Sequence, residues 1–406
     1  MKATVTNISR RLTVRKNRTE GILNYDIDNA YPQRVVNIIN GSGVATACIQ
    51  MYVKFMMGGG FKDKVFYKAK LNRNGLTCDK LLRKICTQLA VHNGIAIHIN
   101  YNALFEVCEV NYLPFQYCRL TDPESTKANK VAIYDDWDRI KRFTFDKKKI
   151  QYVDFFNPNP DIIQEQVTAA GGWDKYKGQI YYWAPGGIEY PLAAFDSILE
   201  DIQTDGEIKL FKFRNVTTQF MASHILFSPP VEETDKTDWM NSLEDFQGAD
   251  NTAKIINIET ATPDNYKLQK VDVQNIENIF SYTESSVKEN IVRQFNIPPV
   301  LMGILQGGKL GTSKEIQDAT EFFNGITAPE RLVIEEIFSE IMSRFAEKVN
   351  PSADYSILTY QNPVINSEIE QQFLPYFTIN EVRKNKGYEP IEDGDVRLVN
   401  TPPVKN

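Results

Sequence analysis

The residues with the clearest potential for chemistry lie in a glycine-rich loop. The stretch Gly303-Ile-Leu-Gln-Gly-Gly308-Lys309 matches the GxxxxGK spacing of loops that hold phosphate with backbone amides and one lysine. The next residue is Leu310, so the hydroxyl that binds magnesium in such loops is missing. The preceding IPPVLM is also a poor buried strand. The pattern favours a flexible loop with one lysine, and a nucleotide-dependent DNA enzyme using Lys309 is the alternative.

Two other groups of side chains could hold a metal ion. The first contains two thiols and two imidazoles, at spacings that fit no common zinc pattern: Cys78, Cys86, His92 and His98. The second contains three carboxylates around Trp137, which a solvated turn explains equally well: Asp135, Asp136 and Asp138. Buried thiols and ordinary polar side chains are the favoured interpretation, so no metal and no cofactor are expected.

Composition argues against several classes of protein. The chain has three histidines, no GxSxG and no Cys-His signature, which predicts that it is not an enzyme. Its formal net charge of -6 is unlike that of a general polyanion binder. No run of about 18 apolar residues is present, so no membrane partner is expected. Five cysteines without a CxxC pair suit a reducing compartment.

The glycine-rich loop joins two helical segments. Residues 276–296 have apolar side chains at helical spacing, and Pro298-Pro299 end that helix. Thr312 with Glu315 fits a capping box, so a second helix begins there. Its apolar period resumes beyond Pro329, which predicts a bend and not an end. The sequence therefore predicts helix, loop and kinked helix.

The rest of the chain reads as an α+β protein. Residues 1–30 are basic and are expected to form a loosely held arm. Helices are predicted at 31–61, 79–92, 190–222 and 378–387, and antiparallel strands between 95 and 183. A short helix near 162–170 interrupts the strands, and 355–360 returns as a strand. Strands at 253–258 and 266–271 form a small module between two long helices, as if the module were held on a stalk.

Five stretches resemble portal proteins of tailed bacteriophages, in the compact portal family of the long-tailed phage type. They are IEYPLAAFDSILEDI (188–202), RNVTTQFMASHILFSPP (214–230), RQFNIPPVLMGI (293–304), FNGITAPERLVIEEIFSEI (323–341) and TINEVRKNKGYEPIEDGD (378–395). Together they cover the family's stem helix, passage into the clip, aromatic-x-aliphatic-Pro-Pro signature, kinked helix and Thr-x-Asn-Glu-x-Arg ending. The order is the family's order over roughly residues 30–400. Residues 171–182 and the basic arm depart from the pattern.

The resemblance implies a portal-like α+β fold with the following parts. They are an N-terminal arm (1–30), an α+β wing (31–187 with 350–375), stem helix 1 (188–222), a small αβ clip (223–275), stem helix 2 (276–296), a Gly-rich tunnel loop (297–312), a kinked tunnel/wing helix (313–349) and a crown-like C-terminal segment (376–406). About twelve copies would form a ring at one capsid vertex, with double-stranded DNA passing through the channel. Localisation would be the virion, and the host cytoplasm during assembly.

The same resemblance suggests site residues and partners. The channel and tunnel-loop candidates are Gln306, Gly307, Gly308, Lys309 and Lys314; the clip candidates for terminase docking are Trp239, Phe246, Glu244 and Asp245; the stem candidates are Lys209, Lys212, Lys288 and Arg293. The partners implied are further copies of the chain, the terminase large subunit, the major capsid protein and the neck or adaptor proteins. A capsid-associated structural protein without DNA contact is the remaining alternative.

Overall fold

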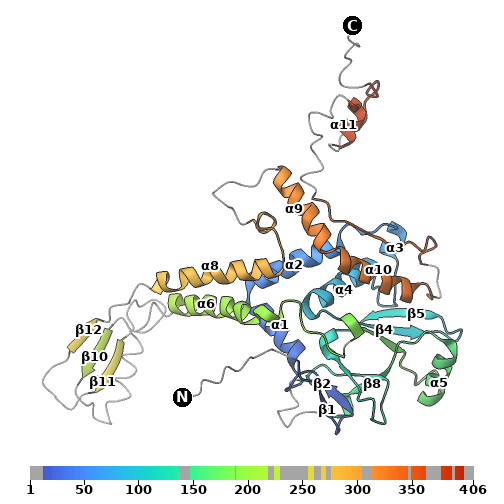
Figure 1. Ribbon diagram of the computed structural model, residues 1–406, viewed down its shortest axis with the longest axis horizontal. Coiled ribbons are helices and arrows are strands. Elements are labelled where there is room, and N and C mark those ends of the chain that lie inside the picture. The colour runs from blue at the N-terminus through green and yellow to red at the C-terminus, as the bar shows by residue number, and fades with distance from the viewer. Residues whose placement is uncertain are drawn as a thin grey trace, which may run out of the picture. The chain divides into compact units, whose positions relative to one another are not determined.

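The structure, a computed structural model (Figure 1), is mixed α and β. It describes residues 12–137, 147–187, 189–217, 224–228, 255–259, 267–270, 276–303, 313–345, 349–362, 376–385 and 389–396. The chain divides into two compact units. The first, called the body, contains residues 1–36, 47–196 and 295–406; the second, called the inserted unit, contains residues 37–46 and 197–294.

A six-stranded sheet forms the centre of the body. Its strands are β4 (Ile95–Tyr101), β5 (Val107–Tyr112), β6 (Cys118–Leu120), β7 (Lys130–Ile133), β8 (Gln151–Phe155) and β9 (Gln179–Trp183), in the order β5-β4-β9-β8-β7-β6. All neighbours are antiparallel except β8 and β9, so the prediction of antiparallel strands is wrong at this pair. The reason is α5 (Pro160–Ala170), a helix between the two strands, which returns the chain in the original direction.

The N-terminal helices of the body lie where the spacing of apolar residues predicts them, except that one predicted helix is two. The helix predicted at 79–92 is confirmed as α4 (Cys78–His92), which contacts β4. The single helix predicted at 31–61 is wrong, because α1 (Tyr31–Gly41) and α2 (Gly43–Met57) are separated by Ser42. The Ser42 hydroxyl accepts a hydrogen bond from the Ala45 amide at 3.1 Å, which caps α2.

The basic N-terminal segment is more ordered than predicted in its second half. β1 (Arg15–Asn17) pairs with β2 (Ile22–Asn24), and Ile22 and Tyr25 are buried. Tyr25 stacks on Tyr190, with ring centroids 4.1 Å apart. The prediction of a loosely held arm is therefore wrong for residues 15–30, because their apolar side chains form part of the core.

Arg119 on β6 is the largest polar side chain in this core, and it is fully buried. Its guanidinium donates to five oxygens: Asn29 Oδ1 and O, Gln33 Oε1, Gln116 O and Cys118 O. The rings of Tyr25 and Trp137 lie 5.4 and 5.2 Å from it. Within the part of the chain that the structure describes, no carboxylate pairs with it. Burial lowers the pKa of Arg119, because it disfavours the charged form.

Two helices and a strand complete the body from the C-terminal part of the chain. α9 (Ser313–Ile326) and α10 (Ala328–Met342) are separated by Thr327 alone, and Pro329 lies in the first turn of α10. The prediction of one bent helix is therefore wrong, because α9 ends at Ile326 and a second helix begins at Ala328. The second helix ends at Met342 and not at 349, and Thr312 lies outside the described residues. β13 (Ile357–Leu358) pairs with β3 (Gly60–Phe61), and Phe338 packs against Phe61 at 4.8 Å between centroids.

The C-terminal helix begins as the sequence predicts. α11 (Ile379–Asn385) is preceded by Thr378, whose hydroxyl accepts from the Glu381 amide at 3.2 Å. The Glu381 carboxylate accepts from the Thr378 amide at 2.8 Å in return. This reciprocal pair is a capping box, because each side chain satisfies an amide that the helix leaves unpaired.

Apart from residues 37–46, the described part of the inserted unit contains a helix pair and a small sheet (Figure 1). α6 (Leu199–Thr217) and α8 (Ile276–Gln294) are the two helices. The helix predicted from Tyr190 begins only at Leu199, because Tyr190 and Asp196 are hydrogen-bonded to Leu23 and Tyr31. β10 (His224–Ser228) lies between β11 (Ile255–Glu259), which is parallel to it, and β12 (Lys267–Lys270), which is antiparallel.

Candidate stem helix pair

The two long helices of the inserted unit pack through their apolar faces. The buried residues on α6 and α8 recur at helical spacing: Leu199, Ile202, Ile208, Val287, Ile291 and Val292. Two cross-helix contacts fix the direction of the pair. Asn290 Nδ2 donates to Asp201 Oδ2 at 3.3 Å near one end, and Lys212 pairs with Glu284 further along. The helices are therefore antiparallel, and the small sheet is inserted in the chain between them.

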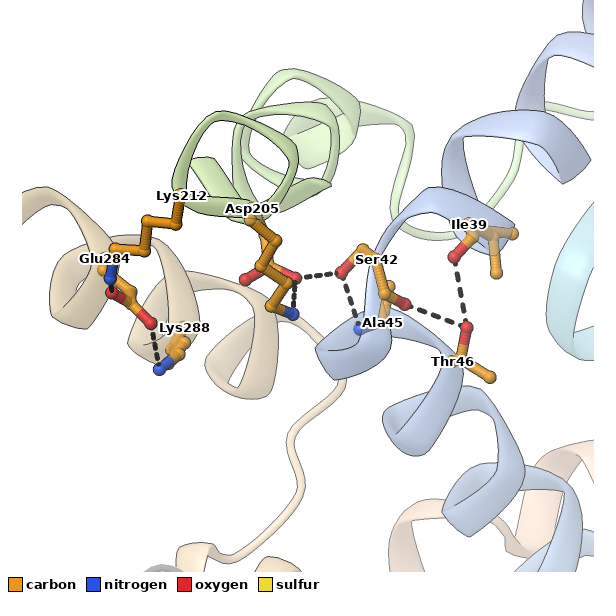
Figure 2. Close-up of polar contacts among 9 residues, drawn as sticks. Ile39, Ser42, Ala45, Thr46, Asp205, Lys212, Glu284 and Lys288 are labelled. Atoms are coloured by element: carbon orange, nitrogen blue, oxygen red, sulfur yellow. Dashed lines mark hydrogen bonds and ion pairs between the residues drawn. The ribbon is translucent and has the colours of Figure 1, made fainter. Parts of the chain in front are cut away.

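A three-residue ion-pair network connects the helices (Figure 2). Glu284 on α8 accepts from Lys212 on α6 and, through its other oxygen, from Lys288 at 2.7 Å. The hydrogen bond from Lys212, followed by that from Lys288, lowers the pKa of Glu284 to about 2. The carboxylate is partly exposed, so water and salt weaken its contribution to stability. The network does, however, fix the register of the two helices.

A second polar cluster joins α6 to the end of α1. Asp205 is 2% exposed and accepts from the Ser42 hydroxyl at 2.6 Å, as Figure 2 shows, and from Lys209 Nζ at 2.6 Å. Thr46 donates to Ile39 O at 3.1 Å and so ties the first turn of α2 to the last turn of α1. A buried carboxylate needs such partners, because water no longer solvates it.

Gly206 in α6 lies close to the backbone at the end of α1. A Cβ atom built there would lie 2.9 Å from the carbonyl oxygen and 3.2 Å from the carbonyl carbon of Gly41. The obstacle is backbone and cannot rotate away. Gly206 thus has a packing role that outweighs its poor helix propensity.

We expect Gly206→Ala to lower the free energy of unfolding by about 1–2 kcal/mol, because the clash outweighs the gain in helix propensity. Gly325→Ala in α9 is the matched control, since a Cβ there has nothing within 4 Å. It should raise the free energy of unfolding by about 0.5–1 kcal/mol. Urea unfolding measures both variants. Equal effects at the two positions would contradict the packing role of Gly206.

The stem lysines predicted from the sequence lie in these clusters. Lys212 and Lys288 meet on Glu284, and Lys209 pairs with Asp205. Arg293 is exposed at the end of α8. Two of these ion pairs have i,i+4 spacing and could have been found from the sequence, namely Asp205–Lys209 and Glu284–Lys288. The roles of Ser42, Gly206 and the Lys212–Glu284 pair were missed, because their partners are distant in sequence.

The other predicted site residues fall in different places. Lys314 is exposed on α9. The tunnel-loop residues Gln306, Gly307, Gly308 and Lys309 and the clip residues Trp239, Glu244, Asp245 and Phe246 lie outside the described residues. Of the four considered for zinc, Cys78, Cys86 and His92 are buried and His98 Nε2 contacts Lys177 O at 2.7 Å. In the described parts of the chain, no three metal-ligating side chains come together and no helix is long and apolar enough to cross a membrane.

Comparisons with known proteins give matches among solved structures only. No protein-family model matches the sequence, and no curated protein matches it. A chain from the virion of a native gene transfer agent particle aligns with a TM-score of 0.45 and 11% identity, over 88% of this chain and 94% of that chain. Chains from the necks of empty and native gene transfer agent particles align at TM-scores of 0.47 and 0.48, with 11% and 12% identity. They cover 88% and 89% of this chain and 94% and 95% of those chains.

Proposed function

We propose that this chain is a portal protein, the ring that forms the DNA channel at one vertex of a tailed phage capsid. The observation that carries the proposal is the inserted unit. An antiparallel helix pair with a three-stranded sheet between its helices interrupts an α+β body. This is the order of wing, stem, clip and stem that the five sequence motifs imply. The body would be the wing, α6 and α8 the stem, and residues 223–275 the clip.

The charges of the helix pair suit a channel through which DNA slides. Each lysine that contacts a phosphate releases counterions and strengthens the grip on DNA. Lys209, Lys212 and Lys288 are instead paired with carboxylates on the same helix pair. A stem with neutralised lysines would slow moving DNA little. The ring would therefore act as a passive conduit and docking hub, with the ATP-driven motor on a separate protein.

Exposed aromatic side chains on the helix pair support assembly into an oligomer. Phe213 on α6 is 64% exposed and Tyr282 on α8 is 83% exposed. Large apolar groups in water are costly, and contact with a neighbouring copy would bury them. The clip residues Trp239, Glu244, Asp245 and Phe246 would dock the terminase and later the neck or adaptor proteins, and the wing would contact the major capsid protein.

The proposal is tested by the assembly state of the purified protein. Electron microscopy and native mass measurement should show a closed ring of about twelve copies with a central channel. A protein that stays monomeric under all conditions tried would contradict the proposal. Binding of ATP by the purified chain would favour the alternative of a nucleotide-dependent DNA enzyme, because a portal should bind none.

Lys309→Ala tests the role proposed for the tunnel loop. The variant should assemble into normal rings but package or retain DNA several-fold less well, because a cation that contacts the phosphate backbone in the channel is lost. Ring imaging and a packaging assay with the matching terminase measure the two properties. Lys175→Ala, which removes an exposed lysine from the body, is the matched control. Failure of Lys309→Ala to assemble would contradict the proposed role.

A further inference from the structure

The exposed side of α9 and α10 carries an unusual surface, which we call the acidic face. Between residues 313 and 342 the chain has seven Asp and Glu but only Lys314 and Arg331 as cations, and Arg331 is buried. The carboxylates of Asp318, Glu321 and Glu336 are exposed, and none has an ion-pair partner among the described residues. An unbalanced row of carboxylates repels itself, so a cationic partner surface would stabilise it.

An apolar stripe runs along the same face. Phe322, Gly325, Pro329 and Leu332 are all exposed and follow one another at spacings of three or four residues. That spacing places them on one side of the bent helix pair. Phe322 is 59% exposed and Leu332 is 64% exposed. An apolar stripe with a charged border has the composition of a docking surface, with an apolar centre and a polar rim.

A surface of opposite charge lies elsewhere on the body, and we call it the basic face. Residues 62–84 contain eight Lys and Arg and only two Asp. The exposed members on α3 (Lys64–Lys68) and α4 are Lys64, Lys68, Lys80 and Arg83. Val65 on α3 is 76% exposed. Lys68, Lys80 and Arg83 have no ion pair within the described chain. The two Asp are engaged, because Asp63 caps α3 and Asp79 accepts from Thr77.

The exposed sides of α3 and α10 point away from each other. Phe66 on α3 and Phe338 on α10 are buried and meet edge to face at 6.3 Å. On α10, exposed Glu336 precedes Phe338 by two residues, which is a rotation of roughly 200° around the helix. On α3, Lys64 has the same relation to Phe66. Glu336 and Lys64 therefore lie on opposite sides of the Phe66–Phe338 contact and cannot pair with each other within one copy.

We infer that the acidic face of one copy docks on the basic face of the next copy. Charge complementarity argues for this occupant, because the two faces carry opposite charges and each also exposes apolar side chains that the other can cover. The contact joins different surfaces of identical chains, so it propagates from copy to copy and closes into a ring when the rotation allows. The inference thus rests on the proposed function and names the surfaces through which the ring would form.

Charge reversal tests the inference. An acid-reversed variant carries Asp318→Lys and Glu336→Lys, and a base-reversed variant carries Lys68→Glu and Lys80→Glu. Each variant alone should associate roughly ten- to a hundredfold more weakly than the wild type, because like charges then meet at the contact. An equimolar mixture should assemble again, since each variant keeps one native face and its reversed faces complement each other. The double-reversed chain should also assemble.

Controls separate this inference from the proposed function. Glu165→Lys with Lys175→Glu reverses exposed charges elsewhere on the body and should leave the rings unchanged. Circular dichroism checks that every variant is folded. If the wild type forms rings and both single-face variants do so equally well, or if their folded mixture stays monomeric, the inference is overturned and the portal proposal stands. If the wild type forms no ring under any condition, both are overturned.

Discussion

Replacement of Arg119 by Met is expected to lower the free energy of unfolding by at least about 3 kcal/mol. Met fills a similar volume but makes none of the five hydrogen bonds of the guanidinium. The carbonyl oxygens of Asn29, Gln116 and Cys118 would lose this donor in a site that water does not reach. The variant no longer buries a cation, which offsets part of the lost stability. The unsatisfied acceptors outweigh this gain, so the free energy of unfolding falls.

Urea unfolding of Arg119→Met measures the effect, and Arg73→Met is the control. Arg73 pairs with Glu109 at 3.1 Å, but its side chain is 92% exposed. Its replacement should change the free energy of unfolding by less than about 1 kcal/mol. Arg119→Lys should restore only part of the stability, because an ammonium group has three donors and cannot copy the planar guanidinium. A stability of Arg119→Met within about 0.5 kcal/mol of the wild type would show that the core repacks around the loss.

Stability should also fall by about 2 kcal/mol between pH 7 and pH 5, because of His92. The imidazole is buried and stacks on Phe115, with ring centroids 5.4 Å apart. Burial, with a smaller contribution from the charge of Arg119, lowers the pKa of His92 to about 3. The unfolded chain takes up a proton on this side chain below about pH 6.5, whereas the folded chain does not. The stability is therefore lost as the pH falls from about 6.5 towards 3.

His92→Phe keeps a ring against Phe115 and removes the titrating group, so this variant should lack that pH dependence between pH 7 and pH 5. His98→Gln is the matched control, since His98 lies in β4 and is partly exposed. The range from pH 7 to pH 5 reports on His92, because the pKa of the paired Glu284 carboxylate is lowered to about 2. Protonation of Glu284 therefore affects stability only at lower pH. If His92→Phe and the wild type lost stability in parallel over this range, the assignment to His92 would be wrong.

The sequence predicted best where the signal is local. The period of apolar residues placed α4 and α8 to within two residues, and the helix predicted at 378–387 is α11, which begins at Ile379. Prediction from the sequence failed where the local structure depends on a residue that is distant in the sequence. Ser42 ends one helix and caps the next, and its hydroxyl also binds Asp205, far along the chain. A three-residue strand such as β6 is too short to show a period, so nothing predicted that Arg119 would be buried.

In the candidate stem helix pair, too, the local contacts could be predicted from the sequence and the contacts between distant residues could not. The i,i+4 ion pairs of the helix pair follow from local spacing. The Lys212–Glu284 contact and the close approach of Gly206 to Gly41 depend on how the inserted unit folds, and no local pattern encodes them. The direction of β8 relative to β9 likewise depends on the crossover through α5, which is visible in sequence only if helix and strands are considered together.

The interruption of the body by the inserted unit has a consequence for synthesis on the ribosome. Phe195 and Phe295 lie side by side where the chain leaves and re-enters the body, with ring centroids 5.3 Å apart. Phe61 and Phe66 depend on Phe338, which emerges on the order of ten seconds after Asp196 at ordinary translation rates. Until then the nascent chain exposes these rings. We expect the growing polypeptide to need chaperones during this interval.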